Sequence, residues 1–226
     1  MKASLRQPIG RPKVVSRIPE ILHRCRGRKV LHLGCADAPY TTQRGDDLLH
    51  KQLAQQSEPD QLWGVDADEK GVALLREMGF PNIMLGNCES LQSDLLREEF
   101  DIVLAGEIIE HVDNPGNFLN AIRGVMTPRT ELLLTTANAT SVKGFSHALT
   151  GVEKVHPDHN YYFSYHTLRQ LLEKCSLKTH EVFYYQDVAG GGVAGLADRA
   201  LQLAAKVVPG WSDGVIIIAR LTDEGI

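Results

Sequence analysis

The sequence lacks a long hydrophobic run and has few cysteines. No apolar stretch approaches the roughly 20 residues that a spanning helix needs, so we expect no stable membrane insertion. Residues 1–13 are basic, but the apolar segment of a secretion signal does not follow them. The four cysteines include no C-x-x-C pair, so the spacing indicates neither a zinc site nor a disulfide framework. We therefore expect a cytoplasmic protein.

An excess of positive charge is also missing. The chain has 24 Lys and Arg against 28 Asp and Glu, which gives a net charge of −4 at pH 7. Because binding to nucleic acid needs a basic surface, this balance argues against a nucleic-acid partner. The length of 226 residues and the hydrophobic content of 43% are typical of one globular domain. We expect a single domain over residues 1–226, with an N-terminal arm and helix at 1–28.

Two phosphate-binding patterns are absent from the stretch that carries the clearest ligand signal. The apolar run Val30–Leu33 ends at Gly34, after which the residues are small. A strand that opens onto glycine lets backbone N–H groups approach a ligand closely. The Lys-Ser/Thr phosphate loop is missing, and Ala36 and Ala38 interrupt the Gly-x-Gly-x-x-Gly pattern of dinucleotide sites. The stretch therefore predicts a nucleotide-type pocket whose ligand is not held by its phosphates.

A carboxylate ends the next apolar run of the chain. This run is Leu62–Asp66, and Asp66 is its last residue. At the tip of the second strand of a βαβ unit, a carboxylate can accept hydrogen bonds from both hydroxyls of a ribose. Together with the phosphate-free loop, Asp66 indicates an adenosyl ligand without a diphosphate.

Strand patterns and helix patterns alternate along the chain. Strands are predicted at 30–33, 62–66, 83–85, 101–104, 131–136, 177–185 and 215–221. Helices are predicted at 14–25, 40–56, 70–78, 117–126, 167–175 and 194–208. This alternation is typical of a doubly wound, parallel α/β sheet, whose ligand lies beyond the C-terminal ends of the strands.

Five stretches within residues 29–138 carry a family resemblance. They are VLHLGCADAP, LWGVDAD, NIMLGNCESL, FDIVLAGEIIEHVDNPGNFL and ELLLTTANA. In this order and spacing they resemble the class I S-adenosylmethionine (SAM)-dependent methyltransferases, in the branch of ubiquinone-biosynthesis O-methyltransferases and many sugar and natural-product enzymes. The resemblance implies a Rossmann-like sheet of seven strands, the last one antiparallel. It also implies SAM as cofactor and S-adenosylhomocysteine (SAH) as product.

The resemblance further implies a set of cofactor-binding residues at the ends of the first four strands. They are Gly34, Cys35, Ala36, Asp37, Asp66, Ala67, Asn87, Cys88, Glu89 and Gly106. Three positions depart from the usual pattern. Where the family has an acidic residue, a glycine and an aspartate, this chain has His32, Ala36 and Asn87.

A polar motif, Glu-x-x-Glu-His, follows the fourth predicted strand. If the segment is helical, Glu107, Glu110 and His111 lie on one face, because they are three and four residues apart. We include Glu107 and His111 among the catalytic candidates. The alternative is structural: Glu107 tethers the cofactor loop, Glu110 is solvated and His111 caps a turn.

The region after the fifth strand is too long for a simple connection and is predicted to form a substrate lid over residues 139–166. It contains His156 and His159. Because histidine titrates near neutral pH, it can take a proton from an acceptor as the methyl group is transferred. We choose His159 first and His156 second for this general base. The alternative is a lid histidine that only bonds to backbone.

A metal hypothesis joins the two groups. By resemblance to small-RNA 2′-O-methyltransferases of this superfamily, Glu107, Glu110, His111 and His159 are candidate ligands for a divalent metal. The letters alone do not fix a geometry, so we assign no metal ligand from the sequence.

The prediction is a SAM-dependent methyltransferase that transfers a methyl group to a hydroxyl of a small molecule. The resemblance leaves open a sugar, a quinone precursor or a natural-product scaffold as acceptor. The alternatives are an N- or C-methyltransferase, an RNA 2′-O-methyltransferase with a divalent metal, an NAD-binding oxidoreductase, or a non-catalytic SAM-binding protein. The amphipathic pattern at 194–208 is compatible with a homodimer contact.

Overall fold

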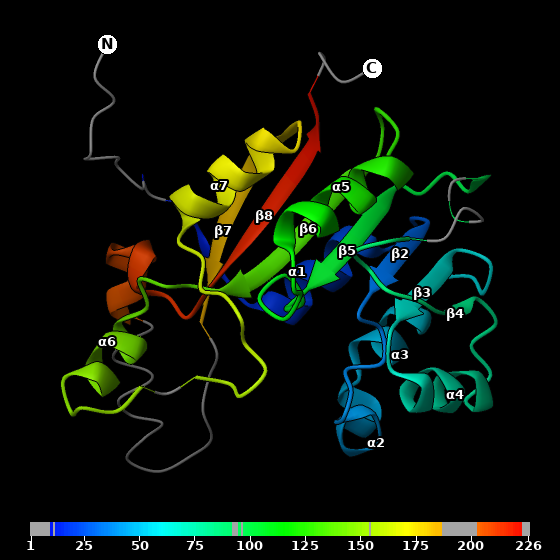
Figure 1. Cartoon of the computed structure of the whole chain (residues 1–226), viewed down its shortest axis with the longest axis horizontal. Coiled ribbons are helices and arrows are strands. Elements are labelled where there is room, and N and C mark those ends of the chain that lie inside the picture. The colour runs from blue at the N-terminus through cyan, green and yellow to red at the C-terminus, as the bar shows by residue number, and fades with distance from the viewer. Residues whose placement is uncertain are drawn as a thin grey trace.

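A single sheet runs through the molecule and carries helices on both faces (Figure 1). The computed structural model describes residues 10, 12–91, 95, 97–153, 155–186 and 203–222. The strands are β1 (Val14–Val15), β2 (Val30–Leu33), β3 (Leu62–Asp66), β4 (Ile83–Leu85), β5 (Ile102–Gly106), β6 (Glu131–Ala137), β7 (Leu177–Tyr185) and β8 (Gly214–Leu221). The helices are α1 (Arg17–Cys25), α2 (Thr41–Arg44), α3 (Leu49–Ala54), α4 (Glu69–Glu77), α5 (Pro115–Val125), α6 (Val142–Ala148) and α7 (Tyr165–Lys174), with 3₁₀ turns η1 (Gly45–Asp47) and η3 (Pro209–Trp211).

The strand order confirms the predicted doubly wound topology. The sheet runs β1-β7-β8-β6-β5-β2-β3-β4, and the strands from β6 to β4 pair in parallel. The last strand, β8, is antiparallel to both β6 and β7, as predicted. All seven predicted strands are present, and the short strand β1 adds an eighth at the edge.

Burial on both faces explains why the parallel strands are almost uniformly apolar. In β2 all four residues are buried, and Leu31 pairs with Trp63 of β3 and Val103 of β5. One face packs against α5 and α7 in a cluster that includes Phe118 and Leu168, whereas the other packs against α1 and α3. In Figure 1 the helices α5 and α7 lie in front of the sheet and α1 lies behind it. Central parallel strands are therefore covered on both sides, as this fold requires.

The N-terminal element differs from its prediction. The periodicity predicts a helix over 14–25, but Val14 and Val15 pair with Tyr184 and Tyr185 of β7, and α1 begins at Arg17. Pro19 thus falls in the first turn of α1, where proline is tolerated because the early N–H groups have no helical partner. β-branched residues at the open edge of β7 join the sheet rather than extend the helix.

Two other predicted helices also differ in the structure. The predicted helix over 40–56 is split into α2, the 3₁₀ turn η1 and α3. The break falls at Gly45–Asp47, where glycine and two aspartates disfavour a helix interior. Of the predicted helix at 194–208, residues 203–207 are helical and 194–202 lie outside the described residues.

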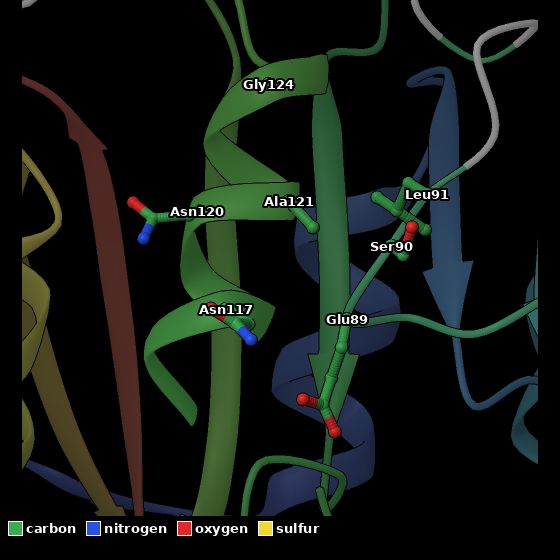
Figure 2. Close-up of a pocket in the computed structure, with 7 residues that line it drawn as sticks. All are labelled: Glu89, Ser90, Leu91, Asn117, Asn120, Ala121 and Gly124. Atoms are coloured by element: carbon green, nitrogen blue, oxygen red, sulfur yellow. The ribbon is translucent and has the colours of Figure 1, made fainter. Parts of the chain in front are cut away.

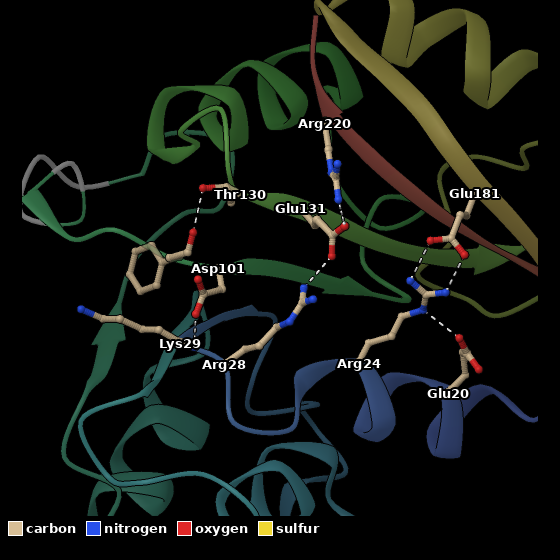
Figure 3. Close-up of polar contacts among 10 residues, drawn as sticks. Glu20, Arg24, Arg28, Lys29, Asp101, Thr130, Glu131, Glu181 and Arg220 are labelled. Carbon is tan, nitrogen blue, oxygen red and sulfur yellow. Dashed lines mark hydrogen bonds and ion pairs between the residues drawn. The ribbon is translucent and has the colours of Figure 1, made fainter.

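Ion pairs join the elements at the N-terminal edge of the parallel strands (Figure 3). Glu131, the first residue of β6, accepts hydrogen bonds from Arg28 ahead of β2 and from Arg220 in β8, both at 2.6 Å. Arg24 of α1 pairs with Glu20 at 2.7 Å and with Glu181 of β7 at 2.9 Å. These contacts join α1 to β7, and join β6 to β8 and to the residues ahead of β2, at the end opposite the predicted site.

Candidate active site

The predicted cofactor residues lie together at one edge of the sheet. They follow four neighbouring parallel strands, β2, β3, β4 and β5, whose C-terminal ends meet at this edge. The loop 34–37 follows β2, Asp66 and Ala67 end or follow β3, residues 87–89 follow β4, and Gly106 ends β5. The topology therefore brings together residues that the sequence places on four separate segments.

Gly34 begins a tight loop, which we call the cradle (residues 34–37). Its N–H donates to the carbonyl oxygen of Val65 at 2.8 Å, and its φ angle of +72° lies in the left-handed region that favours glycine. A Cβ at this position would lie 3.0 Å from Cδ1 of Ile108. The cradle is thus close to the turn after β5, and a side chain at position 34 would press on that turn.

Asp66 points toward the cradle. Its carboxylate accepts the N–H of Ala36 at 2.8 Å and the N–H of Asp68 at 2.9 Å. The residue is only 8% exposed, and this burial raises the pKa of its carboxyl above the ordinary value in spite of the backbone donors. Ala67 beside it is exposed. An acceptor group therefore lies between the first loop and the tip of β3, where an adenosyl ribose is expected.

The loop after β4 lies against the cradle through Cys88. Its thiol contacts the backbone of Gly34, and burial raises its pKa to about 12, so the thiol is neutral. Cys35 and Ala36 are buried as well. Asn87 uses its side-chain oxygen to accept the N–H of Glu89 at 2.8 Å.

Glu89 bonds to the residues directly before helix α5. Its carboxylate accepts the N–H groups of Asp113 and Asn114 at 2.8 and 3.0 Å. It also lines a shallow cavity of about 370 Å³ between residues 89–91 and α5, together with Asn117, Asn120 and Gly124 (Figure 2). Glu89 is the only predicted cofactor residue in this cavity, which holds none of the candidate histidines. We therefore do not identify the cavity as the cofactor site.

His32 does not face the cradle. It is 3% exposed, and its Nδ1 lies 3.2 Å from Nδ1 of His50 in α3. Burial, followed by the nearby His50 and Arg17, lowers the pKa of His32 well below its ordinary value. At the position where the family has an acidic residue, this chain therefore has a neutral imidazole packed into the core.

The Glu-x-x-Glu-His motif forms a turn, so the single helical face that would align its residues is not present. Glu107 has a φ angle of +55°, and its N–H donates to the carbonyl oxygen of Thr135 at 3.0 Å. Its carboxylate accepts a hydrogen bond from the hydroxyl of Tyr185, at the end of β7. The contact passes over Gly214, where a Cβ would be only 1.9 Å from the Tyr185 ring.

Glu110 is fully buried, which excludes its predicted solvated role. Burial, together with the nearby Glu107 carboxylate, raises the pKa of Glu110 to about 8. One carboxyl oxygen faces the N–H of Ala137 at 3.5 Å, and the other has no hydrogen-bond partner among the described residues. Burial therefore favours the protonated form of this side chain.

Three histidines form a cluster beside this turn. The ring centroids of His111 and His159 are 4.6 Å apart, those of His156 and His159 are 5.3 Å apart, and those of His111 and His156 are 5.6 Å apart. Nδ1 of His111 lies 3.1 Å from the carbonyl oxygen of Asp158. Burial, followed by the two neighbouring imidazoles, lowers the pKa of His159. We refer to His111, His156 and His159 as the histidine cluster.

Asn160 and Tyr161 hold the two halves of the cluster together, although they are not among the predicted site residues. Their N–H groups donate to the carbonyl oxygen of Glu110 at 2.8 and 3.2 Å. The side-chain amide of Asn160 donates to the carbonyl oxygen of His111 at 2.9 Å, and the Tyr161 hydroxyl donates to that of Asp113 at 2.9 Å. Their position directly after His159 is the feature of the sequence that could have identified them as site residues.

The cradle and the histidine cluster are neighbours. Tyr40, just beyond the cradle, meets the His156 ring edge-on, with 6.5 Å between the ring centroids. Glu107 and Glu110 belong to the same turn as His111 but bond elsewhere. Of the four predicted catalytic residues, the structure therefore brings His111, His156 and His159 together and places Glu107 with Tyr185.

The comparisons with known proteins agree with this architecture. A family model described as "Methyltransferase domain" matches residues 44–134. A ubiquinone biosynthesis O-methyltransferase of Bradyrhizobium sp. (strain ORS 278) is 35% identical over 98 residues, covering 42% of this chain and 38% of that protein. The chain spans 38% to 52% of the length of the first curated relatives it matches.

Solved structures resemble about nine tenths of the chain. A SAM-dependent methyltransferase from Archaeoglobus fulgidus aligns with a TM-score of 0.57 at 16% identity, covering 90% of this chain and 91% of that one. The magnesium protoporphyrin IX methyltransferase of Synechocystis PCC 6803, with SAH bound, aligns with a TM-score of 0.59 at 14% identity, covering 91% and 82%.

The fold and the matched segment are those of class I SAM-dependent methyltransferases, to which the chain is similar. The cofactor of these proteins is SAM, and this chain presents residues that fit it: a buried carboxylate at the tip of β3 and a loop that begins with a glycine, Gly34. Among the described residues, no helix combines the length and the apolar character that crossing a membrane requires.

Proposed function

We propose that the protein transfers the methyl group of SAM to a hydroxyl of a small molecule. The observation that supports this proposal is the position of the histidine cluster next to the cradle, with His156 in contact with Tyr40. A proton acceptor beside the cofactor site is what a hydroxyl needs, because the oxygen must lose its proton as it is methylated. The curated relatives named as ubiquinone biosynthesis O-methyltransferases are compatible with oxygen as the acceptor atom.

When bound, SAM would supply a methyl group for an in-line displacement, in which the carbon–sulfur bond breaks as the acceptor oxygen bonds to the methyl carbon and SAH leaves. We infer that the carboxylate of Asp66 accepts the ribose hydroxyls, because it is buried at the tip of β3 and faces the cradle. The backbone of residues 34–37 approaches the remainder of the cofactor. These groups orient the donor, which is the main task of the protein in such a reaction.

We assign the general base to His159. Its Nδ1 is buried and has no hydrogen-bond partner among the described residues, so this nitrogen is available to a ligand. The ring lies against His111 and Tyr162, which fix its position. His156 is the second candidate, since its Nδ1 already faces the N–H of Asp158 at 3.3 Å. Glu107 and His111 then position this turn and do not accept the proton themselves.

The test separates cofactor binding from turnover. SAH binding is measured by calorimetry, and methyl transfer from SAM is followed by mass spectrometry with a phenol, a sugar and an amine as acceptors. We expect His159→Asn to keep SAH binding within about twofold and to lower turnover by about 10² or more, the usual contribution of a general base. Asp66→Asn is expected to weaken SAH binding by more than about tenfold, because the ribose loses a charged acceptor.

His147→Asn is the matched control, since His147 lies on α6 and is not part of the histidine cluster. Unchanged turnover in His159→Asn, or methylation of the amine alone, would refute the proposed base and acceptor. Failure of the wild-type protein to bind SAH would refute the function itself. The cytoplasmic location, the small-molecule acceptor, the lid over 139–166 and a homodimer stay predictions.

A further inference from the structure

We propose that the histidine cluster is a binding site for one divalent transition-metal ion, such as zinc, with three imidazole ligands and no carboxylate. The ligand atoms that His111, His156 and His159 offer all lie within 4.8 Å of one another. The inference rests on this geometry and not on the proposed methyl transfer.

The three imidazole nitrogens need to move only a little closer together to bind one ion. Zinc binds imidazole nitrogen at about 2.1 Å in tetrahedral sites, so the three nitrogens must come to about 3.4 Å from one another. The three side chains are half-buried, so they can move by the required 1 to 2 Å or so without disturbing the core. A fourth, open position would remain for water or another ligand.

The backbone around the cluster is already fixed. His159 donates its N–H to the carbonyl oxygen of His156 at 3.1 Å, which closes the turn that carries both imidazoles. Asn160 and Tyr161 tie this turn to the one that carries His111. The site therefore does not have to be assembled from mobile segments when an ion binds.

Two of the rings have a nitrogen ready for a ligand. Nδ1 of His111 donates to the carbonyl oxygen of Asp158, and such a contact leaves Nε2 with a free lone pair and orients the ring. Nδ1 of His159 is buried without a partner among the described residues. A buried nitrogen that lacks a partner is costly unless a ligand satisfies it.

The two carboxylates of the Glu-x-x-Glu-His motif are committed elsewhere. Glu107 accepts the hydroxyl of Tyr185, and Glu110 is fully buried with one carboxyl oxygen facing the N–H of Ala137. The site therefore differs from the carboxylate-containing set that the Glu-x-x-Glu-His motif predicts. Neutral imidazoles favour zinc, cobalt, nickel or copper, whereas magnesium prefers oxygen ligands. We expect millimolar magnesium to leave the site empty.

A nitrogen that holds an ion cannot accept a proton at the same time. If His159 is the general base, bound zinc is therefore expected to inhibit methyl transfer, and a chelator is expected to restore it. Activation by zinc would keep the metal site and would overturn the role of His159 as base. The two proposals can thus fail separately.

The test is metal binding by the apo-protein in the absence of SAM and acceptor. Zinc affinity is measured by competition with a chromophoric chelator, and cobalt is added as a spectroscopic probe whose visible bands report tetrahedral coordination. We expect one ion per chain in the wild-type protein. His156→Asn and His159→Asn are each expected to weaken binding by more than about tenfold and to remove the tetrahedral cobalt spectrum.

His147→Asn is the control for loss of a lid histidine outside the cluster, and thermal melts verify that each variant folds. Glu107→Gln and Glu110→Gln are expected to leave zinc affinity within about twofold, because neither carboxylate is a ligand. If either glutamate variant loses binding as His156→Asn does, or if His156→Asn binds as the wild type does, the three-imidazole site is wrong.

Discussion

At the scale of single residues, the most unusual feature is the buried histidine pair, His32 and His50. Their rings stack with 5.4 Å between centroids, and the two Nδ1 atoms are 3.2 Å apart, so one must donate to the lone pair of the other. Two protonated rings would oppose N–H to N–H in a site without water access. Burial lowers the pKa of His50 to about 4, and it lowers that of His32 well below its ordinary value.

The pair predicts a loss of stability in mild acid. A histidine whose folded pKa lies below its unfolded value of 6.5 contributes stability that is present above pH 6.5 and is lost as the pH falls toward the folded value. From pH 7 to pH 5, His50 alone is expected to lower the free energy of unfolding by about 2 kcal/mol. Urea unfolding at the two pH values measures this change.

The control for this prediction is His50→Leu, which removes one of the two rings and is measured in the same buffers. Glu110 acts in the opposite sense, since its raised pKa makes the folded state lose stability as the pH rises toward 8, but it is common to both proteins. We expect the acid-induced loss to be smaller in His50→Leu. An equal loss in the two proteins would mean that the pair does not carry the effect.

Residue identity predicted some of these contacts and not others. His32 stands out in the sequence because it replaces the usual acid of the family, yet nothing near His50 identifies it as the partner in α3. Asp66 was predictable because a strand tip fixes both its position and its direction. The direction of Glu89 was not predictable, because its hydrogen bonds to Asp113 and Asn114 depend on where α5 begins.

At the scale of elements, the joint between β7, β8 and the turn after β5 depends on one small residue. Gly214 begins β8, and the ring of Tyr185 occupies the space that a Cβ there would fill. The Tyr185 hydroxyl can therefore reach Glu107, which stands in a left-handed conformation that is uncommon outside glycine. The contact connects the antiparallel edge of the sheet to the site.

Gly214→Ala is expected to lower the free energy of unfolding by about 1 to 3 kcal/mol, the usual cost of overpacking a core. Most of this loss should disappear in a Tyr185→Ala background, because the new Cβ at position 214 then has no ring to clash with. Urea unfolding of the four proteins in this cycle measures the coupling. Gly124→Ala in α5 is the control, since nothing lies within 4 Å of its Cβ and alanine favours a helix. Additive losses would show that the two positions do not interact.

The elements themselves were largely predictable, because each central strand is a short apolar run and its helices carry a 3.6-residue period. The exceptions are informative. Val14 and Val15 pair with β7, a tertiary contact that local periodicity cannot reveal. The motif at 107–111 has the spacing of a helix but forms a turn, since the bond between Tyr185 and Glu107 and the burial of Glu110 draw its side chains apart.

At the scale of the whole molecule, the two ends of the strands have different tasks. The C-terminal end carries the cradle and the histidine cluster, with buried carboxyls of raised pKa at Asp66 and Glu110. The N-terminal end carries the ion pairs of Figure 3, which join segments far apart in the chain. The strained and desolvated groups of the site thus lie opposite the groups that tie the sheet together.

This division predicts that the N-terminal end contributes to stability and not to binding. Burial raises the pKa of Glu131, but the hydrogen bonds from Arg220 and Arg28 outweigh it and lower the pKa overall, so this stability is present above pH 4.5 and is lost in acid. Glu131→Gln is expected to lower the free energy of unfolding by about 1 kcal/mol at pH 7, because both arginines are half-exposed and screened by solvent. The difference from the wild type should shrink in high salt and at pH 3, whereas SAH affinity should not change.

Glu173→Gln is the control: it breaks a more exposed pair with Arg169 and should lower the free energy of unfolding by less. A loss of SAH affinity in Glu131→Gln would mean that the two ends of the sheet are energetically coupled.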